Sequence, residues 1–420
     1  MSGLTMAEKI LLSHTDEKRI EPGEIIEATI DVAMSHEMMG TRVLPQLVEG
    51  GVKDIWDPSR VVMILDHWAP APTVQAATIH QQVREFVSEY GIKHFYDVGR
   101  GICHQVLVEE GHIRPGELVV GTDSHTTTAG AFGALATGIG ATDMAIVLAT
   151  GRLWFRVPET IKITYSGNLP PMVMGKDIIL YTLGELGVEG ATFQALEYHG
   201  EALAKLSLDA WMTLTNMAVE IGAMAALIPS DKRVIEYVKT RTDRKFKPIR
   251  PDDNADYDQS IGFDVSTLTP QVATPSLPTQ AVPVAEVAGT PIDQAYLGSC
   301  TNGRLEDLQI AAKVINSNQI AEGVRFIVTP ASRQIYHAAL NDGTIGTLVK
   351  AGATIGPATC GACFGGHCGL LAPGEVCISS TNRNFPGRMG SAEAQIYLAS
   401  PATVAASAIT GKITDPRGGK

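Results

Sequence analysis

The stretch Leu118-Val119-Val120-Gly121-Thr122-Asp123-Ser124-His125 joins a short run of strand-forming residues to a polar, reactive tail. Three other parts of the chain repeat this pattern: residues 61–65 run into Asp66 and His67, residues 295–297 into 299–300, and residues 376–378 into 379–383. Helix-like stretches such as 78–90 and 305–314 lie between them, which favours an α/β fold with mainly parallel strands. Because open α/β sheets bind ligands outside the carboxyl ends of their strands, these four ends predict one shared cleft.

Length and composition narrow the class of protein. At 420 residues the chain exceeds one compact core, so we expect two to four lobes. Its 45% hydrophobic and 19% charged residues are typical of a globular protein. The net charge of -12 argues against a general affinity for nucleic acid, and an anionic substrate would need a local cationic patch.

Two shifts in composition suggest domain boundaries. Pro, Thr, Gln and Asp dominate residues 252–286, which we interpret as an interdomain linker with some local structure. A softer boundary is expected near Pro158, before the strand-like residues 160–165.

The N-terminus and the cysteines indicate a cytoplasmic protein. Thr5-Met6-Ala7-Glu8 predicts a capping box that opens a helix through Leu12, and no signal peptide is recognised. The longest uncharged stretch, 129–142, is too short to span a bilayer. Six cysteines in so long a chain do not resemble a secreted disulfide framework, so free thiols or metal ligands are expected.

Three cysteines form a candidate metal site. Cys360 and Cys363 make a CxxC pair, which fits a redox dithiol, half a zinc site or two iron-sulfur ligands, and Cys300 follows a predicted strand. Three thiolates leave one metal position open for chemistry, whereas a fourth from Cys368 or Cys377 would close the site. The glycines at 361, 365 and 366 let backbone approach a bulky inorganic group and favour a cluster over a single ion, and Cys103 is expected to pack as a small hydrophobic residue.

Two acid–imidazole pairs suggest proton transfer. Asp66 precedes His67, and Asp123 lies two residues before His125. A carboxylate that accepts from one ring nitrogen fixes the tautomer and raises the basicity of the imidazole, which suits general acid–base chemistry. A purely structural role is the alternative for either pair alone.

Asn216 and Glu220 are four residues apart and would share one face of a helix. Their neighbours are apolar, and a buried glutamate is costly without a partner, so a functional role is favoured.

Further along, Arg383 and Arg388 lie in a Gly/Pro-constrained loop and could bind carboxylates, or else pair with surface acids. Residues 138–143 resemble a dinucleotide fingerprint only briefly, because Asp143 replaces the third glycine, so helix packing is the better interpretation.

These segments, in order from Thr5 to beyond Gly390, resemble the aconitase superfamily, and within it the stand-alone large subunits of the isopropylmalate dehydratase and homoaconitase group. The resemblance rests on residues 121–126, 298–302, 360–363 and 382–388. It implies a three-lobed α/β/α architecture with mainly parallel sheets around a central cluster cleft. The implied domains are residues 1–158, residues 159–284 ending in the Pro/Thr-rich linker, and residues 285–420, which carry the cluster cysteines.

The same resemblance implies one 4Fe-4S cluster per chain on Cys300, Cys360 and Cys363, with one iron that no cysteine ligates. That iron would act as a Lewis acid on the departing hydroxyl. Asp66 and His67 would assist protonation of this hydroxyl. The implied catalytic residues are Asp66, His67, His104, Asp123, His125 and Glu220. The implied substrate-binding residues are Ser124, Asn216, Asn382, Arg383 and Arg388.

The implied activity is that of a hydro-lyase that isomerises a hydroxy di- or tricarboxylate by dehydration and rehydration. 3-Isopropylmalate in leucine biosynthesis is the first choice, and homoaconitate or a methylmalate or dimethylmalate follows. Single-chain aconitases have a fourth, swivelling domain that carries a serine base, so we expect that domain on a separate small subunit, in a heterodimer or heterotetramer. An RNA-binding regulator in the cluster-free state, or a redox or zinc protein built on Cys360 and Cys363, are the alternatives of another class.

Overall fold

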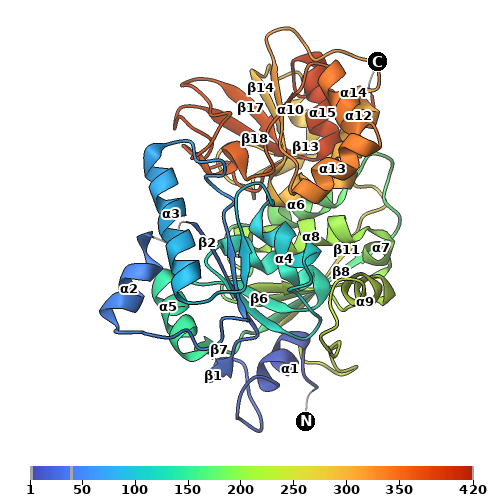
Figure 1. Cartoon of the computed structure of the whole chain (residues 1–420). Coiled ribbons are helices and arrows are strands. Elements are labelled where there is room, and N and C mark those ends of the chain that lie inside the picture. The colour runs from blue at the N-terminus through green and yellow to red at the C-terminus, as the bar shows by residue number, and fades with distance from the viewer. Residues whose placement is uncertain (1–2, 38–40, 419–420) are drawn as a thin grey trace.

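The structure is a computed structural model that describes residues 3–37 and 41–418 (Figure 1). Within these residues the strands form three large sheets and one two-stranded sheet. Most neighbouring strands are parallel, as the sequence predicts for an α/β fold. No helix in the described ranges is long and apolar enough to cross a membrane.

The first sheet has five parallel strands in the order β4-β3-β2-β5-β6. Its strands are β2 (Val32–His36), β3 (Val61–Ile64), β4 (His94–Tyr96), β5 (Leu118–Gly121) and β6 (Leu135–Gly138). The helices of this part are α1 (Met6–Leu12), α2 (Val43–Glu49), α3 (Val74–Glu89), α4 (Cys103–Glu109), α5 (Ala141–Thr150) and the 3-10 helix η2 (Ser124–Phe132). β1 (Ile25–Thr29) and β7 (Arg152–Arg156) pair antiparallel. The predicted capping box at Thr5 and Glu8 is confirmed at the start of α1.

The second sheet has four parallel strands in the order β10-β9-β8-β11. They are β8 (Thr160–Ser166), β9 (Ala195–His199), β10 (Ala225–Leu227) and β11 (Gln259–Asp264). Its helices are α6 (Gly175–Leu186), α7 (Glu201–Lys205), α8 (Leu208–Met217), the 3-10 helix η3 (Ala218–Ile221) and α9 (Lys232–Lys239).

The third sheet has seven strands in the order β13-β12-β18-β17-β14-β15-β16. Its parallel strands are β14 (Gln294–Leu297), β15 (Arg325–Val328), β16 (Thr354–Ile355), β17 (Val376–Ser379) and β18 (Gln395–Ala399). β12 (Gln271–Ala273) and β13 (Ala281–Pro283) extend one edge antiparallel. Its helices are α10 (Val284–Val287), α11 (Ser299–Asn302), α12 (Leu305–Ile315), α13 (Arg333–Asn341), α14 (Thr344–Lys350), the 3-10 helix η4 (Gly361–Phe364) and α15 (Pro401–Thr410).

Residues 252–286 do more than connect two domains. β11 pairs with β8 of the second sheet, whereas β12 pairs with β18 of the third sheet. The third sheet therefore takes two strands from the range 159–284, and the local structure expected within this linker includes the short strands β11, β12 and β13. The exact domain boundaries stay a prediction.

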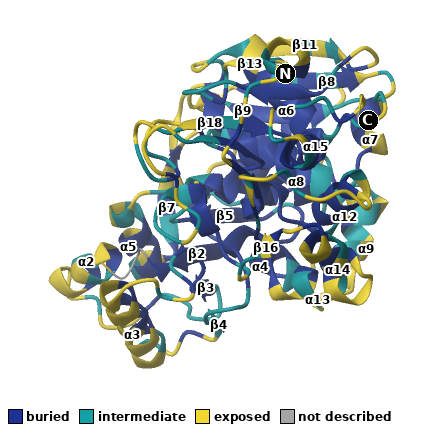
Figure 2. Cartoon of the chain, turned by 90° about the horizontal axis from the view of Figure 1, so that it is seen from above, coloured by how far each residue is buried: buried dark blue, intermediate teal, exposed yellow. Residues whose placement is uncertain are grey.

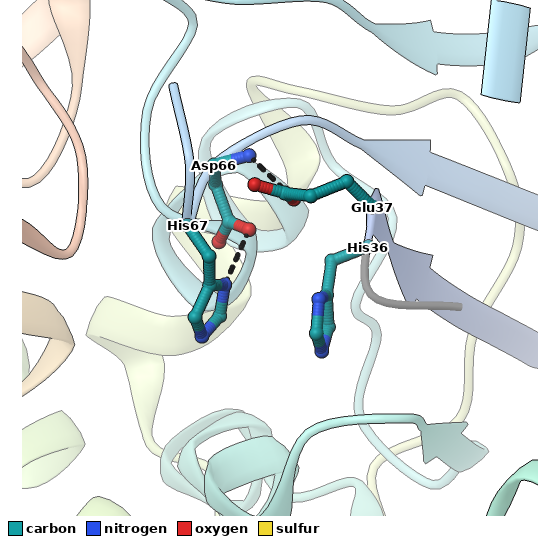
Figure 3. A group of neighbouring side chains, drawn as sticks. All are labelled: His36, Glu37, Asp66 and His67. Atoms are coloured by element: carbon teal, nitrogen blue, oxygen red, sulfur yellow. Dashed lines mark hydrogen bonds and ion pairs between the residues drawn. The ribbon is translucent and has the colours of Figure 1, made fainter. Parts of the chain in front are cut away.

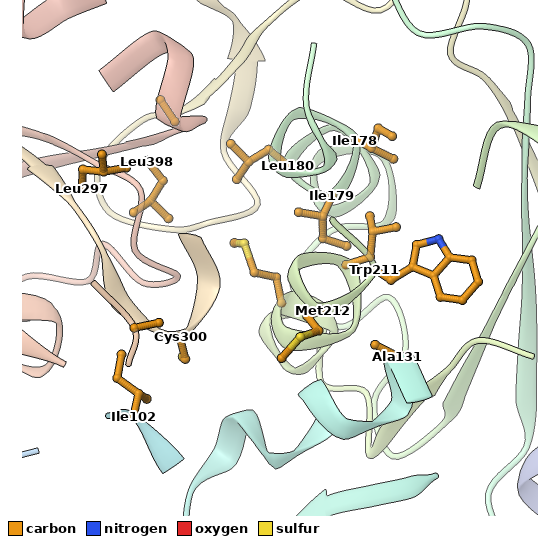
Figure 4. Packing of buried hydrophobic residues seen from close by; sticks show 14 of the residues in the cluster. Ile102, Ala131, Ile178, Ile179, Leu180, Trp211, Met212, Leu297, Cys300 and Leu398 are labelled. Carbon is orange, nitrogen blue, oxygen red and sulfur yellow. The ribbon is translucent and has the colours of Figure 1, made fainter. Parts of the chain in front are cut away.

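The largest hydrophobic core joins all three parts of the chain. It includes Ile102 from the first part, Trp211 and Met212 from α8, and Leu297 and Leu398 from the third sheet, with Cys300 beside them (Figure 4). α6 and α8 lie in the buried centre of the molecule, whereas α2 and α3 expose one face (Figure 2). A core that crosses the three sheets holds their strand ends in fixed positions, which a shared site requires.

Candidate functional site

The reactive residues of the first sheet lie at the carboxyl ends of three neighbouring strands. His36 ends β2, Asp66 and His67 follow β3, and Asp123 follows β5. Since parallel strands end at one edge of the sheet, this arrangement brings the groups together as the sequence predicts. Asp123 also caps η2, where its side chain accepts from the backbone N–H of His125 at 2.7 Å.

Asp66 and His67 form a buried pair. His67 Nδ1 lies 2.7 Å from Asp66 Oδ1, and the backbone N–H of Cys103 donates to Asp66 Oδ2 at 2.7 Å. Glu37 Oε2 accepts from the backbone N–H of Asp66 at 3.0 Å (Figure 3). Burial opposes a charge on His67, but negative charge at Cys360, once its thiol is ionised, and at Asp66 outweighs it and raises the pKa of His67 well above its usual value. His67 can therefore hold a proton at the wall of the site.

Asp123 connects this pair to two further imidazoles. His104 Nε2 lies 2.9 Å from Asp123 Oδ1, and His67 Nε2 lies 3.5 Å from Asp123 Oδ2. Burial disfavours the Asp123 carboxylate, yet the charge of His104 and its hydrogen bond outweigh burial and hold the pKa of Asp123 well below its usual value. Asp123 is thus a fixed negative charge among His67, His104 and His125.

Glu220 pairs with one imidazole and one guanidinium group. His125 Nε2 lies 2.8 Å from Glu220 Oε1, and Arg383 Nε donates to the two carboxylate oxygens at 3.0 and 2.9 Å. The expectation that Asn216 and Glu220 share one helix is wrong, because α8 ends at Met217 and Glu220 lies in η3. Gly222, with a φ of 83°, then ends η3. Both side chains nevertheless reach the site, Asn216 at the cysteines and Glu220 at His125.

The structure brings the three predicted cysteines together. Asn216 Nδ2 lies 3.2 Å and Asn382 Nδ2 lies 3.5 Å from Cys300 Sγ, while Cys363 Sγ lies 3.6 Å from Asn382 Oδ1. Cys360 is buried and hydrogen-bonds with His67. Cys300 follows β14, and Cys360 and Cys363 lie at η4.

The other cysteines have different surroundings. Cys368 is exposed and its sulfur lies 3.1 Å from His367 Nδ1. Cys377 is buried within β17. Cys103 is fully buried in the main hydrophobic core, as expected for a small hydrophobic residue.

The thiols of Cys300 and Cys360 suit the binding of a metal. Burial, followed by the charge of Cys363, raises the pKa of Cys300 to about 12, and burial raises the pKa of Cys360 well above its usual value. Thiolates at these positions therefore need a metal, whose binding releases the thiol protons. Sulfur donors suit iron-sulfur clusters or zinc, and the amide groups of Asn216 and Asn382 supply the N–H donors that tune a metal-bound sulfur.

The structure explains why residue 361 is a glycine differently from the sequence analysis. A Cβ on Gly361 would lie 2.2 Å from the Tyr296 hydroxyl, and its φ is 57°. That hydroxyl donates to the Cys360 carbonyl at 3.0 Å. Gly361 is therefore explained by packing beneath the loop, and the interpretation that it makes room for an inorganic group is not needed.

Two buried basic side chains, Arg304 and Lys176, support the cysteine loops, and sequence reasoning missed both. Arg304 Nη1 donates to the Thr301 carbonyl at 2.7 Å, and Arg304 Nη2 donates to the Cys300 carbonyl. Lys176 Nζ donates to the Ser380 carbonyl at 2.9 Å, just before Asn382. Burial lowers the pKa of Lys176 to about 7, and Cys363 and Cys300 oppose this shift when they are ionised. The signal for Lys176 was a Lys-Asp pair at the start of an otherwise apolar helix.

A cavity of about 400 Å³ opens beside these groups. His67, Asp123, Ser124, Arg383 and Arg388 line it, and so do residues that sequence reasoning missed: His36, Arg42, Thr122 and Phe364. His36 stacks on His67 with ring centroids 4.4 Å apart, and burial lowers its pKa to about 4. Arg388 Nε is buried without a hydrogen-bond partner among the described residues, so it is available to an anionic ligand.

Comparison with known proteins gives consistent results. The model of the aconitase family (aconitate hydratase) matches residues 8–291 and 285–411. A Methanopyrus kandleri protein named 3-isopropylmalate dehydratase large subunit 1 is 54% identical over 415 residues, which cover 99% of each chain. The Aquifex aeolicus 3-isopropylmalate dehydratase large subunit is 47% identical over 99% of this chain and 97% of that protein. A Methanothermobacter thermautotrophicus protein named probable methanogen homoaconitase large subunit is 48% identical over 99% of this chain and 98% of that protein.

One solved structure is similar in fold. Aconitase X of Thermococcus kodakaraensis, in its holo-form, superposes with a TM-score of 0.50 at 12% identity and covers 93% of this chain and 98% of that one. At this identity the likeness concerns the fold, and it agrees with the α/β architecture predicted from the sequence.

Proposed function

Since the chain belongs to the aconitase family, we propose that it is the catalytic large subunit of a hydro-lyase that isomerises a hydroxy acid by dehydration and rehydration. The observation that carries the proposal is that His67, Arg383 and Arg388 line one cavity, while His67 also pairs with the buried Asp66 and hydrogen-bonds with the buried Cys360. We propose 3-isopropylmalate as the substrate, because full-length relatives at 46–54% identity carry that name. Homoaconitate is the second candidate, supported by one relative at 48% identity.

The three thiolates of Cys300, Cys360 and Cys363 would hold a 4Fe-4S cluster. When bound, such a cluster supplies a Lewis acid that withdraws charge from the hydroxyl of the substrate. Asn216 and Asn382 orient the sulfur of Cys300, and Arg304 holds the carbonyl groups of its loop. The protein thus contributes rigid sulfur ligands and their hydrogen-bond donors.

His67 is the proton donor in this proposal. Asp66 fixes its Nδ1, so that Nε2 is directed toward Asp123 and the cavity. A protonated His67 beside a departing hydroxyl converts it to water, and Asp66 stabilises the charge before transfer. His104 and His125 are positioning residues that keep Asp123 ionised and in place.

The cationic side of the cavity suits a substrate with at least two carboxylates. Arg388 has a buried Nε free of partners among the described residues and can bind a carboxylate. Arg383 already pairs with Glu220 through Nε. It therefore binds the substrate with its remaining N–H groups, or its hydrogen bonds to Glu220 lengthen when the substrate binds. Ser124 lines the same wall and can contact the substrate hydroxyl or carboxylate.

A small subunit completes the proposal. The relatives named above are called large subunits, and this chain matches nearly their whole length. We propose that the small subunit supplies the swivelling domain with the base that abstracts the substrate proton. We also propose a cytoplasmic location, in keeping with free cysteines.

An apolar surface beside the cavity supports this partner. Trp154 and Phe193 are 58% and 72% exposed and line a hollow of about 390 Å³. Ile139 and Gly140 line both this hollow and the catalytic cavity. A subunit seated on Trp154 and Phe193 would therefore reach the mouth of the catalytic cavity, and exposed apolar surface of this kind marks interaction sites.

Reconstitution tests the function. The anaerobically purified chain is mixed with its small subunit and assayed against 3-isopropylmalate, homoaconitate and methylmalate. We expect turnover of 3-isopropylmalate that needs both subunits and iron. Full activity of the isolated chain, or a colourless zinc protein that turns over none of these acids, would contradict the proposal.

A further inference from the structure

A second cavity lies at the opposite edge of the first sheet. It measures about 890 Å³ and is lined by residues that come just before three of the strands: Asp31 before β2, Arg60 before β3, and Glu117 before β5. The catalytic residues follow the carboxyl ends of the same strands. Strands of four or five residues separate the two edges by roughly 13 to 17 Å, so this cavity is distinct from the catalytic one.

Cations dominate the lining. Seven lysines and arginines line the cavity against two carboxylates, although the whole chain has a net charge of -12. The two carboxylates are Asp31 and Glu117. The cations are Lys9, Arg60, Arg114, Arg244, Lys245, Lys247 and Arg250. A surplus of five positive charges in one hollow attracts anions.

Three of the seven cations, Lys9, Arg60 and Arg114, form salt bridges with described residues. Lys9 pairs with Asp252, and Arg60 lies 3.3 Å from Asp31 Oδ1 and 3.4 Å from Asp57 Oδ2. Arg244, Lys245 and Lys247 form no salt bridge with any described residue.

Arg114 is the clearest case. Its side chain is only 5% exposed, and Glu117 pairs with its Nη2. Its Nε and Nη1 are buried without a hydrogen-bond partner within the ranges 3–37 and 41–418. Burial, followed by repulsion from Arg244, lowers the pKa of Arg114 to about 10. A buried guanidinium with unpaired N–H groups among like charges is costly, and a bound anion would relieve this cost.

We propose that this cavity is a binding site for a small polyanion whose phosphate or carboxylate oxygens bind Arg114, Arg60 and Arg244. Its volume lies within the roughly 300 to 1,000 Å³ of pockets for small organic ligands. The guanidinium group of arginine can donate two parallel hydrogen bonds to a phosphate or to a carboxylate, so ligands of either kind would be recognised in the same way. The cavity shares no lining residue with the catalytic cavity, and the proposal does not depend on the proposed activity.

Calorimetric titration of the full chain with pyrophosphate and, separately, with citrate tests the proposal. We expect saturable binding of one or both that weakens as salt is added. Tighter binding of pyrophosphate assigns a phosphate ligand, and tighter binding of citrate assigns a polycarboxylate. The double variant Arg244→Gln/Lys247→Gln should weaken binding about tenfold or more, because it removes two of the cations that face the ligand.

Lys313→Gln/Lys350→Gln is the matched control, because it removes the same charge from exposed positions of α12 and α14. It should change the affinity less than about twofold, since these charges lie outside the cavity. Arg388→Gln in the catalytic cavity should leave pyrophosphate binding unchanged. Equal losses in the two double variants, loss in Arg388→Gln, or binding of single-stranded RNA in place of both small anions would overturn the proposal.

Discussion

Replacing Asn216 by alanine tests whether the surroundings of the sulfur ligands are built to hold a metal. Asn216 is fully buried in α8, and its side chain makes four hydrogen bonds. Nδ2 donates to Cys300 Sγ at 3.2 Å and to Thr128 Oγ1 at 2.8 Å. Oδ1 accepts from Thr301 Oγ1 at 3.0 Å and from Asn382 Nδ2 at 3.4 Å.

The expected magnitudes follow from these contacts. Three hydrogen bonds to nitrogen or oxygen partners contribute about 1 kcal/mol each, so their loss removes about 3 kcal/mol. Alanine is the better helix former by about 0.5 kcal/mol, which leaves a net loss of local stability of about 2.5 kcal/mol. Removing the donor to Cys300 should in addition weaken iron binding about 10- to 100-fold, the usual effect of losing a hydrogen bond to a metal ligand.

Two assays separate stability from metal binding. Hydrogen exchange of α8 in the metal-free chain reports local stability, and competition with a chelator reports iron retention. Asn384→Ala is the matched control, because Asn384 is equally buried and donates to the carbonyls of Thr274 and Ile396 at 2.8 and 3.2 Å. Its loss should reduce stability by about 2 kcal/mol while iron retention stays near that of the wild type.

The reasoning fails if Asn216→Ala loses iron no faster than Asn384→Ala. It also fails if the hydrogen exchange of α8 is unchanged, because the four contacts of Asn216 would then contribute nothing to the packing at Cys300.

Three further outcomes are expected. Arg388→Lys should raise the KM for 3-isopropylmalate about tenfold or more with a smaller change in kcat, because a point charge replaces the planar guanidinium group. An unchanged KM in steady-state assays would show that Arg388 does not bind the substrate. Trp154→Ser combined with Phe193→Ser should weaken association with the small subunit in ultracentrifugation but leave iron content unchanged, whereas equal association would place the partner elsewhere. His14→Gln should lower the melting temperature most near pH 6 and least near pH 9. Burial opposes the charge of His14, but the hydrogen bond that its Nε2 donates to Asp31 outweighs burial and raises the pKa of His14 above 6.5. The stabilisation by His14 is therefore complete below pH 6.5 and is lost as pH rises through the folded-state pKa. A loss that does not depend on pH would contradict this assignment.

The sequence predicts those parts of the site that depend on a residue's position relative to the nearest strand or helix. Asp66 and Asp123 are the second residues after β3 and β5, and Cys300 is the third residue after β14. The carboxyl ends of parallel strands bring such positions to one side of a sheet. Their convergence could therefore be expected before any coordinates. The capping box at Thr5 depends on neighbouring residues only and was predicted for the same reason.

The remainder depends on contacts between distant residues. Glu220 finds His125 and Arg383, which lie 95 and 163 positions away, and no local pattern indicates this pairing. β12 joins the third sheet through Val272 and Ala399, so a Pro/Thr-rich segment that resembles a linker becomes part of a sheet. The second cavity gathers cations from Lys9 to Arg250, and their clustering is apparent only in the folded chain.

The iron content of the anaerobically purified chain tests the central claim most directly. We predict roughly three to four irons and a similar amount of inorganic sulfide per chain. Cys300→Ser, Cys360→Ser and Cys363→Ser should each abolish this content, whereas Cys368→Ser and Cys377→Ser should retain it. A chain that binds a single zinc, or one that loses its iron when Cys368 or Cys377 is replaced, would contradict a three-cysteine cluster with an open iron position.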